Sequence, residues 1–252
     1  MTTQAIKERA VQTNRIDPKY QWNSEKPSVL VFDVNETLIN FESMNTLFER
    51  IYGDRHVMRE WLGHLIMYSM TITLSGLYVD YFSLGQGLLQ MVGSIKGVKI
   101  RPEDLEEIKT AMMTMPAHPD VVEGLKLLKK SGYRMVTLTN SPPNPNGKSP
   151  LEQAGLGEYF EQQFSIETIR SYKPAQGVYH MVAQKLDIQP ASCCMVAAHV
   201  WDTIGAQSAG FSAALITRPG NAPLPISGLP QPNFVATDLI HLGKILPSIK
   251  GA

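Results

Sequence analysis

The feature that most constrains the fold is a short apolar run, Val29–Phe32, that ends at once in the carboxylate of Asp33. The run contains no polar residue, which is typical of a strand buried on both faces of a parallel sheet. In such sheets, ligands meet the carboxyl ends of the strands. An unpaired buried carboxylate would be costly, so we expect a cation close to Asp33. The plainer alternative is an aspartate that only caps a turn.

The composition favours a small-molecule partner. The chain has 252 residues, enough for one domain or a core with a modest insertion, and it carries 23 acidic and 23 basic residues. This balance gives no net field to attract nucleic acid or an anionic membrane. The adjacent Cys193 and Cys194 would point to opposite faces of a strand, so we expect them to fill the core rather than form a disulfide framework.

The N-terminal segment, residues 1–27, is polar and charged and lacks the apolar stretch of a secretory signal. We predict a loosely held N-terminal extension on a cytoplasmic protein.

The segment after the first strand predicts a helical insertion over residues 41–115. It is rich in Leu, Met and Tyr, and Trp61, Leu65 and Tyr68 have helical spacing. Within it, Trp61–Val79 carries no Asp, Glu, Lys or Arg but is too polar for a membrane span. We expect a buried helix pair or an oligomer face, and a homodimer formed through this insertion.

The rest of the chain alternates between strands and helices. An amphipathic helix is predicted over Asp120–Lys130, and residues 219–232 are rich in Pro and Gly and predict an irregular loop. Between them we expect strands at Arg134–Leu138, near Phe164, at Cys193–Ala197 and at Ala213–Thr217, and helices at Pro150–Ala154, Ala175–Leu186 and Thr203–Ala209. This alternation implies an α/β fold with a Rossmann-like, doubly wound parallel sheet. Residues 28–40 and 116–252 would form this core.

Polar groups also follow the next three predicted strands. Thr139 and Asn140 follow the second strand, and Lys173 follows the third. The fourth strand is followed by His199, Trp201 and Asp202. Because the carboxyl ends of parallel strands meet at one edge, we expect these side chains to converge with Asp33 on one crevice. Each has a plainer interpretation. Thr139 and Asn140 suit a turn, Lys173 a solvated surface, and Asp202 an N-cap for the helix starting at Thr203.

Taken as a set, these motifs resemble the haloacid dehalogenase superfamily of hydrolases. The matching order is Asp33 with Thr37, Thr139-Asn140, Lys173-Pro174, and Asp202 before Gly205-Ala206. The resemblance covers nearly everything after Pro27. It implies that Asp33 is a nucleophile, that Thr37 and Lys173 stabilise it, and that the helical insertion is a cap over the site.

Two missing carboxylates distinguish the branches of that superfamily. Phosphatase members carry one Asp two residues after the nucleophile and another four residues before the last Asp; here these positions are Asn35 and Ala198. An amide cannot serve as the general acid, and a hard cation needs several oxygen ligands. Magnesium-dependent phosphoryl transfer is therefore disfavoured, and we expect no metal and no other cofactor.

Two segments resemble the metal-independent type II 2-haloacid dehalogenases: Ser171–Pro174 with Val178 and Tyr179, and Ala197–Ala206. This implies that Asp33 displaces halide from a 2-haloalkanoate and that water hydrolyses the resulting ester to a 2-hydroxy acid. Thr37 would orient the nucleophile, and Asp202 would position Lys173 or the water. The expected substrate-binding residues are Asn35, Leu62, Thr139, Asn140, Tyr179 and Trp201, of which Thr139 and Asn140 would hold the carboxylate or the halide.

The chain also departs from that pattern. Where the family has an arginine directly after the cap tryptophan, this chain has Leu62. Where it has a tyrosine two residues after the nucleophile, this chain has Asn35, and Ala197 and His199 replace the serine and asparagine of the last motif. Leucine cannot imitate a bidentate carboxylate clamp. The candidates for the lost charge are Arg50, Arg55 and Arg59.

His199 is a candidate base for ester hydrolysis. Two alternatives to a dehalogenase stay open at this point. One is a phosphatase or phosphonatase-like hydrolase, and the other is a catalytically silent relative that binds a metabolite or a partner through the cap.

Overall fold

A computed structural model describes residues 27–144 and 147–246, so the expected N-terminal extension lies outside the described residues except for Pro27. A six-stranded parallel sheet has the order β3-β2-β1-β4-β5-β6. The strands are β1 (Val29–Phe32), β2 (Arg134–Thr139), β3 (Gln162–Ser165), β4 (Cys193–Ala197), β5 (Ser212–Ile216) and β6 (Phe234–Ala236). The order reverses between β1 and β4, so Asp33 follows β1 at the topological switch point, where such sheets bind ligands. The predicted fold class is confirmed.

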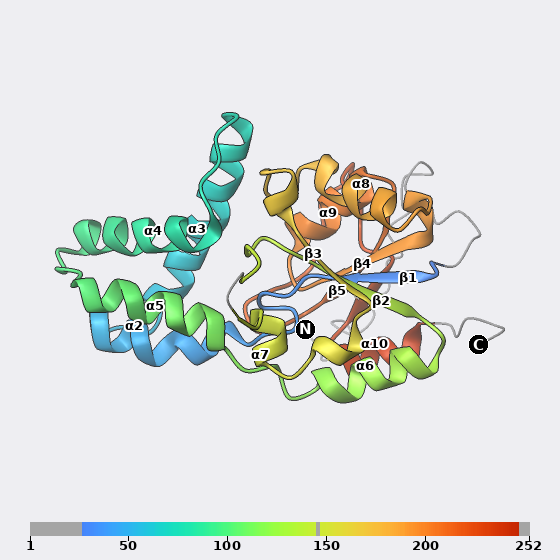
Figure 1. The fold of residues 1–252 in the computed structure, drawn as a ribbon, viewed down its shortest axis with the longest axis horizontal. Helices are drawn as coiled ribbons and strands as arrows, with labels where there is room; N and C mark the ends of the chain where they lie inside the picture. Colours follow the sequence, from blue (N-terminus) through green and yellow to red (C-terminus); the bar gives the residue numbers. More distant parts are fainter. Residues whose placement is uncertain (1–26, 145–146, 247–252) are drawn as a thin grey trace, which may run out of the picture.

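Helices cover both faces of the sheet. Helices α8 (Gln176–Lys185) and α9 (Val200–Ser208) lie on one face, and α6 (Val121–Lys130) and α10 (Leu239–Ile245) lie on the other (Figure 1). The two central strands, β1 and β4, are fully buried, including the free thiols of Cys193 and Cys194. Burial on both faces explains why β1 is an uninterrupted apolar run.

Most element boundaries agree with the sequence to within one or two residues, and β4 agrees at both ends. Helix α9 is different, because it begins at Val200 and not at Thr203, with His199 as its N-cap. The predicted capping role of Asp202 is therefore wrong: Asp202 lies in the first turn of the helix. Strand β6 and helix α10 follow the irregular loop and were not predicted. Short elements complete the core: α7 (Pro150–Gln153), η4 (Gly157–Tyr159), η5 (Ile166–Thr168) and η6 (Pro190–Ser192).

The helical insertion forms a lobe beside the sheet (Figure 1). It consists of η3 (Phe41–Met44), α2 (Asn45–Tyr52), α3 (Val57–Leu74), α4 (Tyr81–Lys96) and α5 (Pro102–Thr114). The buried Trp61 joins α3 to α4, since its indole N–H donates to the Gly85 carbonyl at 2.9 Å. A Cβ on Gly85 would lie 3.2 Å from the Trp61 ring, so glycine allows this close approach. Within the described ranges, no helix has both the length and the apolar character to cross a bilayer.

The last turn of α3 and the segment between α3 and α4 contact the core segment that precedes Lys173. The Tyr172 N–H donates to the Thr73 hydroxyl at 3.0 Å, and the Tyr172 hydroxyl donates to the Val79 carbonyl at 2.7 Å. The Tyr172 ring also packs against Tyr78, with centroids 5.7 Å apart. The insertion is therefore fixed to the segment that carries the lysine.

Candidate active site

Lys173 is the centre of a buried ionic cluster. Its ammonium donates to Asp33 Oδ1 and to Asp202 Oδ2, both at 2.7 Å, and to the Leu138 carbonyl at 3.1 Å. An ammonium has three protons, so all of its donors are used. The Lys173 side chain is 0 % exposed. Burial opposes its charge, but the carboxylates of Asp202 and Asp33 outweigh that effect and raise the pKa of Lys173.

Asp33 is held by a second contact on its other oxygen. The Thr37 hydroxyl donates to Asp33 Oδ2 at 2.7 Å and accepts from the Ala198 N–H at 2.8 Å. Burial would favour the protonated acid, but Lys173 and then His199 outweigh it and lower the pKa of Asp33 to about 2. Asp33 is therefore an ionised carboxylate with a fixed orientation at neutral pH.

Asp202 lies on the far side of Lys173 from Asp33 in this hydrogen-bonded chain. Its Oδ1 accepts a hydrogen bond from the Tyr179 hydroxyl at 2.7 Å. Tyr179 is fully buried, and burial followed by the charge of Asp202 raises the pKa of Tyr179 well above its usual value. The structure thus places Tyr179, an expected substrate-binding residue, behind Asp202 as its hydrogen-bond donor and outside the cavity lining.

The loop after Asp33 is fixed by two residues that the sequence did not single out. Arg218 is buried and donates to the Thr37 carbonyl from Nε and Nη2, at 3.1 and 2.9 Å, and to Asp120 Oδ1 at 2.6 Å. His118 Nε2 lies 3.0 Å from the Glu36 carbonyl, which can only accept, so this nitrogen carries the proton. Burial and the charge of Arg218 lower the pKa of His118 to about 4. The loop after Asp33 is thus held by the Arg218 cation and by the neutral imidazole of His118.

A second buried chain of polar groups reaches Asp33 from the other side. His199 Nε2 lies 2.6 Å from Glu36 Oε2, and His199 Nδ1 lies 3.6 Å from Asp33 Oδ2. The other oxygen of Glu36 forms an ion pair with Arg59 of α3, whose Nη2 also donates to the Pro219 carbonyl at 3.0 Å. His199 thus lies between two carboxylates, with Nε2 facing Glu36 and Nδ1 facing Asp33.

Glu36 is the main functional residue that the sequence analysis missed. It is 3 % exposed and has a φ of 66°, in the left-handed region that a residue with a Cβ seldom adopts. In the sequence it stands between Asn35 and Thr37, in a polar stretch that only Val34 and Leu38 enclose, so no local pattern marked it as buried. A buried acid needs partners, but its partners His199 and Arg59 are distant in the sequence.

A cavity of about 10 Å³ lies against these groups. This is room for about one water molecule. The core and the helical insertion both line it, through Asp33, Asn35, Glu36, Phe41, Leu62, Ile66, Ser69, Tyr81, Asn140, His199 and Trp201. The insertion is thus closed over the carboxylate.

Four of the expected substrate-binding residues line this cavity: Asn35, Leu62, Asn140 and Trp201. Asn140 accepts the Lys173 N–H at 3.2 Å through its Oδ1, and the Asn35 amide donates to the Ser141 hydroxyl at 3.2 Å. The Trp201 ring stacks on His199, with centroids 5.0 Å apart.

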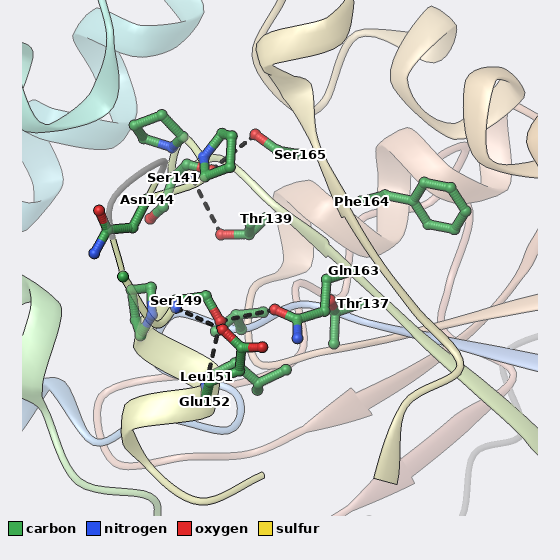
Figure 2. A pocket seen from close by; sticks show the side chains of 15 residues that line it. Thr137, Thr139, Ser141, Asn144, Ser149, Leu151, Glu152, Gln163, Phe164 and Ser165 are labelled. Atoms are coloured by element: carbon green, nitrogen blue, oxygen red, sulfur yellow. Dashed lines mark hydrogen bonds between the residues drawn. The ribbon is translucent and has the colours of Figure 1, made fainter. Parts of the chain in front are cut away.

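Thr139 has a different position. Its hydroxyl accepts the Ser141 N–H at 3.1 Å and lines a neighbouring cavity of about 200 Å³ between β2, β3 and α7 (Figure 2). Ser165, in the same wall, donates to the Ser141 carbonyl at 2.8 Å. Asp33 lines the smaller cavity and not this larger one, so the smaller one is the candidate site for chemistry at this carboxylate.

The three arginines considered as replacements for the family arginine are all engaged. Arg50 pairs with Asp104 and Glu107, Arg55 pairs with Glu49, and Arg59 pairs with Glu36. None of the three lines the cavity.

The donor set also bears on metal binding. Asp33 and Asp202 are joined by the Lys173 ammonium. Across residues 27–144 and 147–246, no three His, Cys, Asp or Glu side chains are grouped in a way that could hold a metal ion. Asn35 and Ala198 supply no carboxylate at the positions where a hard cation would need one.

Comparisons with known proteins agree with this geometry. Residues 27–210 match the sequence model of the haloacid dehalogenase-like hydrolases. A relative, (S)-2-haloacid dehalogenase 1 of Pseudomonas sp. strain CBS-3, is 32 % identical over 68 % of this chain and 74 % of its own length. The (S)-2-haloacid dehalogenase of Xanthobacter autotrophicus is 26 % identical over 75 % of this chain and 74 % of its own.

Solved structures show the same fold. The L-2-haloacid dehalogenase of Xanthobacter autotrophicus, with chloropropionic acid covalently bound, superimposes with a TM-score of 0.77. The match covers 86 % of this chain and 97 % of that chain, with 23 % identity.

Proposed function

The chain belongs to the haloacid dehalogenase-like hydrolases, and from this premise we propose that it is a 2-haloacid dehalogenase whose nucleophile is Asp33. One observation carries the proposal: a buried carboxylate, kept ionised by Lys173 and oriented by Thr37, lies at the wall of a closed cavity. A desolvated, fixed carboxylate is a competent nucleophile toward carbon. The helical insertion would act as the cap that excludes bulk water.

In the first step, an oxygen of Asp33 attacks the carbon that bears the halogen. A C–O bond forms, the carbon–halogen bond breaks, and the halide leaves with the bonding electron pair. Lys173 and Thr37 hold the carboxylate in place for this attack. The product of the step is an ester on the Asp33 side chain.

In the second step, His199 is the base. Its Nδ1 has no hydrogen-bond partner among the described residues and lies 3.6 Å from Asp33 Oδ2. A water that lies beside Nδ1 and the ester would give a proton to Nδ1 and attack the acyl carbon of the ester. The acyl C–O bond then breaks, which restores Asp33 and releases the 2-hydroxy acid. Glu36 would stabilise the imidazolium that forms.

The reaction is proposed to need no metal ion. The Lys173 ammonium supplies the positive charge between Asp33 and Asp202. A divalent cation at the same place would face that ammonium at close range, which is electrostatically unfavourable.

Halide release from 2-chloropropionate and chloroacetate, with and without EDTA, tests the proposal. We expect release that EDTA leaves unchanged and that disappears in Asp33→Asn. His199→Asn should release about one equivalent of halide and then stop, because the ester forms but is not hydrolysed. Magnesium-dependent hydrolysis of a phosphate ester would favour a phosphatase instead. No turnover of either class would favour a silent binding relative.

Two further expectations belong to this proposal. The insertion exposes apolar side chains on α3 and the turn after it, Met67, Leu74, Leu77 and Val79, which would suit a homodimer face. The mass in solution, measured for the wild type and for Leu74→Glu, tests this. A cytoplasmic location would suit the two free cysteines, and cell fractionation tests it.

A further inference from the structure

The cavity at Asp33 has no cation available to pair with a substrate carboxylate. Its lining has two carboxylates, Asp33 and Glu36, and no lysine or arginine. Leu62, 5 % exposed, contributes an apolar side chain to this lining from the helical insertion. A negatively charged substrate would therefore enter a site whose own lining is acidic.

The cations near this cavity are already neutralised. Lys173 donates its three protons to Asp33, Asp202 and the Leu138 carbonyl. Arg59 pairs with Glu36 and donates to the Pro219 carbonyl.

Arg218 and His199, two other basic side chains close to this site, also face hydrogen-bond acceptors. Arg218 donates to the Thr37 carbonyl and to Asp120. Any charge on His199 faces the carboxylate of Glu36 at 2.6 Å.

The donors left over around the cavity are neutral. Asn140 uses its Oδ1 to accept from Lys173, which leaves its amide N–H groups for a ligand. The Trp201 indole N–H is buried and has no hydrogen-bond partner among the described residues. A buried donor without a partner is costly, so a ligand or water that accepts from it is expected. Neutral N–H donors suit a carbonyl oxygen whether or not the substrate carries a charge.

Resting on the dehalogenase function above, we propose that this site accepts uncharged 2-halo carbonyl compounds, 2-haloacetamides in particular, at least as well as 2-haloacetates. The carbonyl oxygen would accept from Asn140 and Trp201. Asp33 attacks the carbon that bears the halogen, and the halide leaves with the electron pair. Water then hydrolyses the ester, so that chloroacetamide and water give 2-hydroxyacetamide, chloride and a proton.

The test compares kcat/KM for chloride release from chloroacetamide and from chloroacetate in the full chain. Asp33→Asn serves as the background, because it removes enzymatic displacement and leaves any slow alkylation of the protein. We expect the ratio of amide to acid to be one or more. A preference for the acid of more than about 100-fold, about 2.7 kcal/mol, would overturn the inference.

A pair of variants at Leu62 tests whether the absence of a cation from the lining sets the ratio of amide to acid. Leu62→Arg supplies the absent cation and should shift the ratio toward chloroacetate by about tenfold or more. Leu62→Met, similar in volume and uncharged, should leave the ratio close to that of the wild type. If Leu62→Arg folds and both variants keep the wild-type ratio, the missing charge does not set specificity and the inference fails.

A third variant tests the neutral donor without adding charge to the site. Trp201→Phe removes the indole N–H and should lower kcat/KM for chloroacetamide by about 3- to 10-fold. Most of this change should be a rise in KM. An unchanged KM would contradict the role given to Trp201.

The outcomes separate the two proposals. If neither substrate releases chloride, the dehalogenase function itself is wrong. If only chloroacetate does, that function stands and the inference about uncharged substrates fails.

Discussion

Two parts of the cavity wall differ in how completely their polar groups are paired. In the ionic cluster, Lys173 uses all three protons and Asp33 has a partner on each oxygen. In the part formed by Leu62 and the start of α9, the leucine is apolar, and the Trp201 N–H and His199 Nδ1 have no partner among the described residues. The difference indicates that the groups for displacement are preorganised, whereas the groups that would meet a substrate and a water await a ligand.

The largest effect is expected on the paired side. Lys173→Met would leave two buried carboxylates without a counter-charge, so the free energy of unfolding should fall by about 3 to 5 kcal/mol. Halide release should disappear. Urea denaturation measures the free energy of unfolding, and a halide assay measures the release. Lys109→Met, on an exposed face of α5, is the matched control and should change neither. A Lys173→Met protein as stable as the wild type would show that the cluster is not held by this charge.

Removing the hydroxyl of Thr37 should have a smaller effect. Thr37→Val keeps the shape of the side chain but takes away the donor to Asp33 and the acceptor of the Ala198 N–H. A buried amide without a partner costs about 1 to 3 kcal/mol, and halide release should slow. Thr37→Ser keeps the hydroxyl and should stay close to the wild type. Equal rates in Thr37→Val and Thr37→Ser would contradict the orienting role.

The pH dependence of stability reports on His118, which donates to the Glu36 carbonyl in the loop after Asp33. The folded chain keeps His118 neutral down to a pKa of about 4, against 6.5 for an ordinary histidine. Below pH 6.5 the unfolded chain binds a proton that the folded chain does not bind until about pH 4. The free energy of unfolding therefore falls as the pH drops through this window.

For His118 alone, the fall from pH 7 to pH 5 should be about 2 kcal/mol. His118→Gln keeps a donor for the Glu36 carbonyl and removes the titration, so this part of the pH dependence should be absent. Urea denaturation at the two pH values measures the difference. An identical slope in the wild type and in His118→Gln would exclude His118 as its source.

The smallest expected effect compares two tryptophans. Trp61→Phe removes an N–H that donates to the Gly85 carbonyl, whereas Trp201→Phe removes one without a partner among the described residues. The loss of unfolding free energy should be larger for Trp61→Phe, by about 1 kcal/mol. Equal losses would indicate that the Trp201 N–H is already satisfied in the free protein.

Much of this arrangement follows from the sequence. The apolar run before Asp33 and the alternation of strands and helices fix a parallel sheet, and such a sheet brings the ends of its strands to one edge. For this reason Asp33, Lys173 and Asp202 could be expected to meet. The resemblance to the type II dehalogenases also led us to expect Leu62 in place of an arginine of that family, and Leu62 lines the cavity.

The remainder depends on contacts between distant segments, which no local pattern encodes. Glu36 pairs with His199 and Arg59, and Arg218 reaches back to Thr37, only because the folded sheet places them together. The start of α9 at Val200 was missed because Asp202 is a good N-cap residue by type. In the fold its carboxylate is used by Lys173 and Tyr179 instead.

Isotope transfer in a single turnover tests the central claim most directly. With enzyme in excess over chloroacetate in ¹⁸O water, the account predicts that the first product contains no ¹⁸O. The label should appear in the peptide that contains Asp33, because water attacks the acyl carbon of the ester. Label in the first product, with none in that peptide, would mean that water attacks the substrate directly and that Asp33 is not the nucleophile.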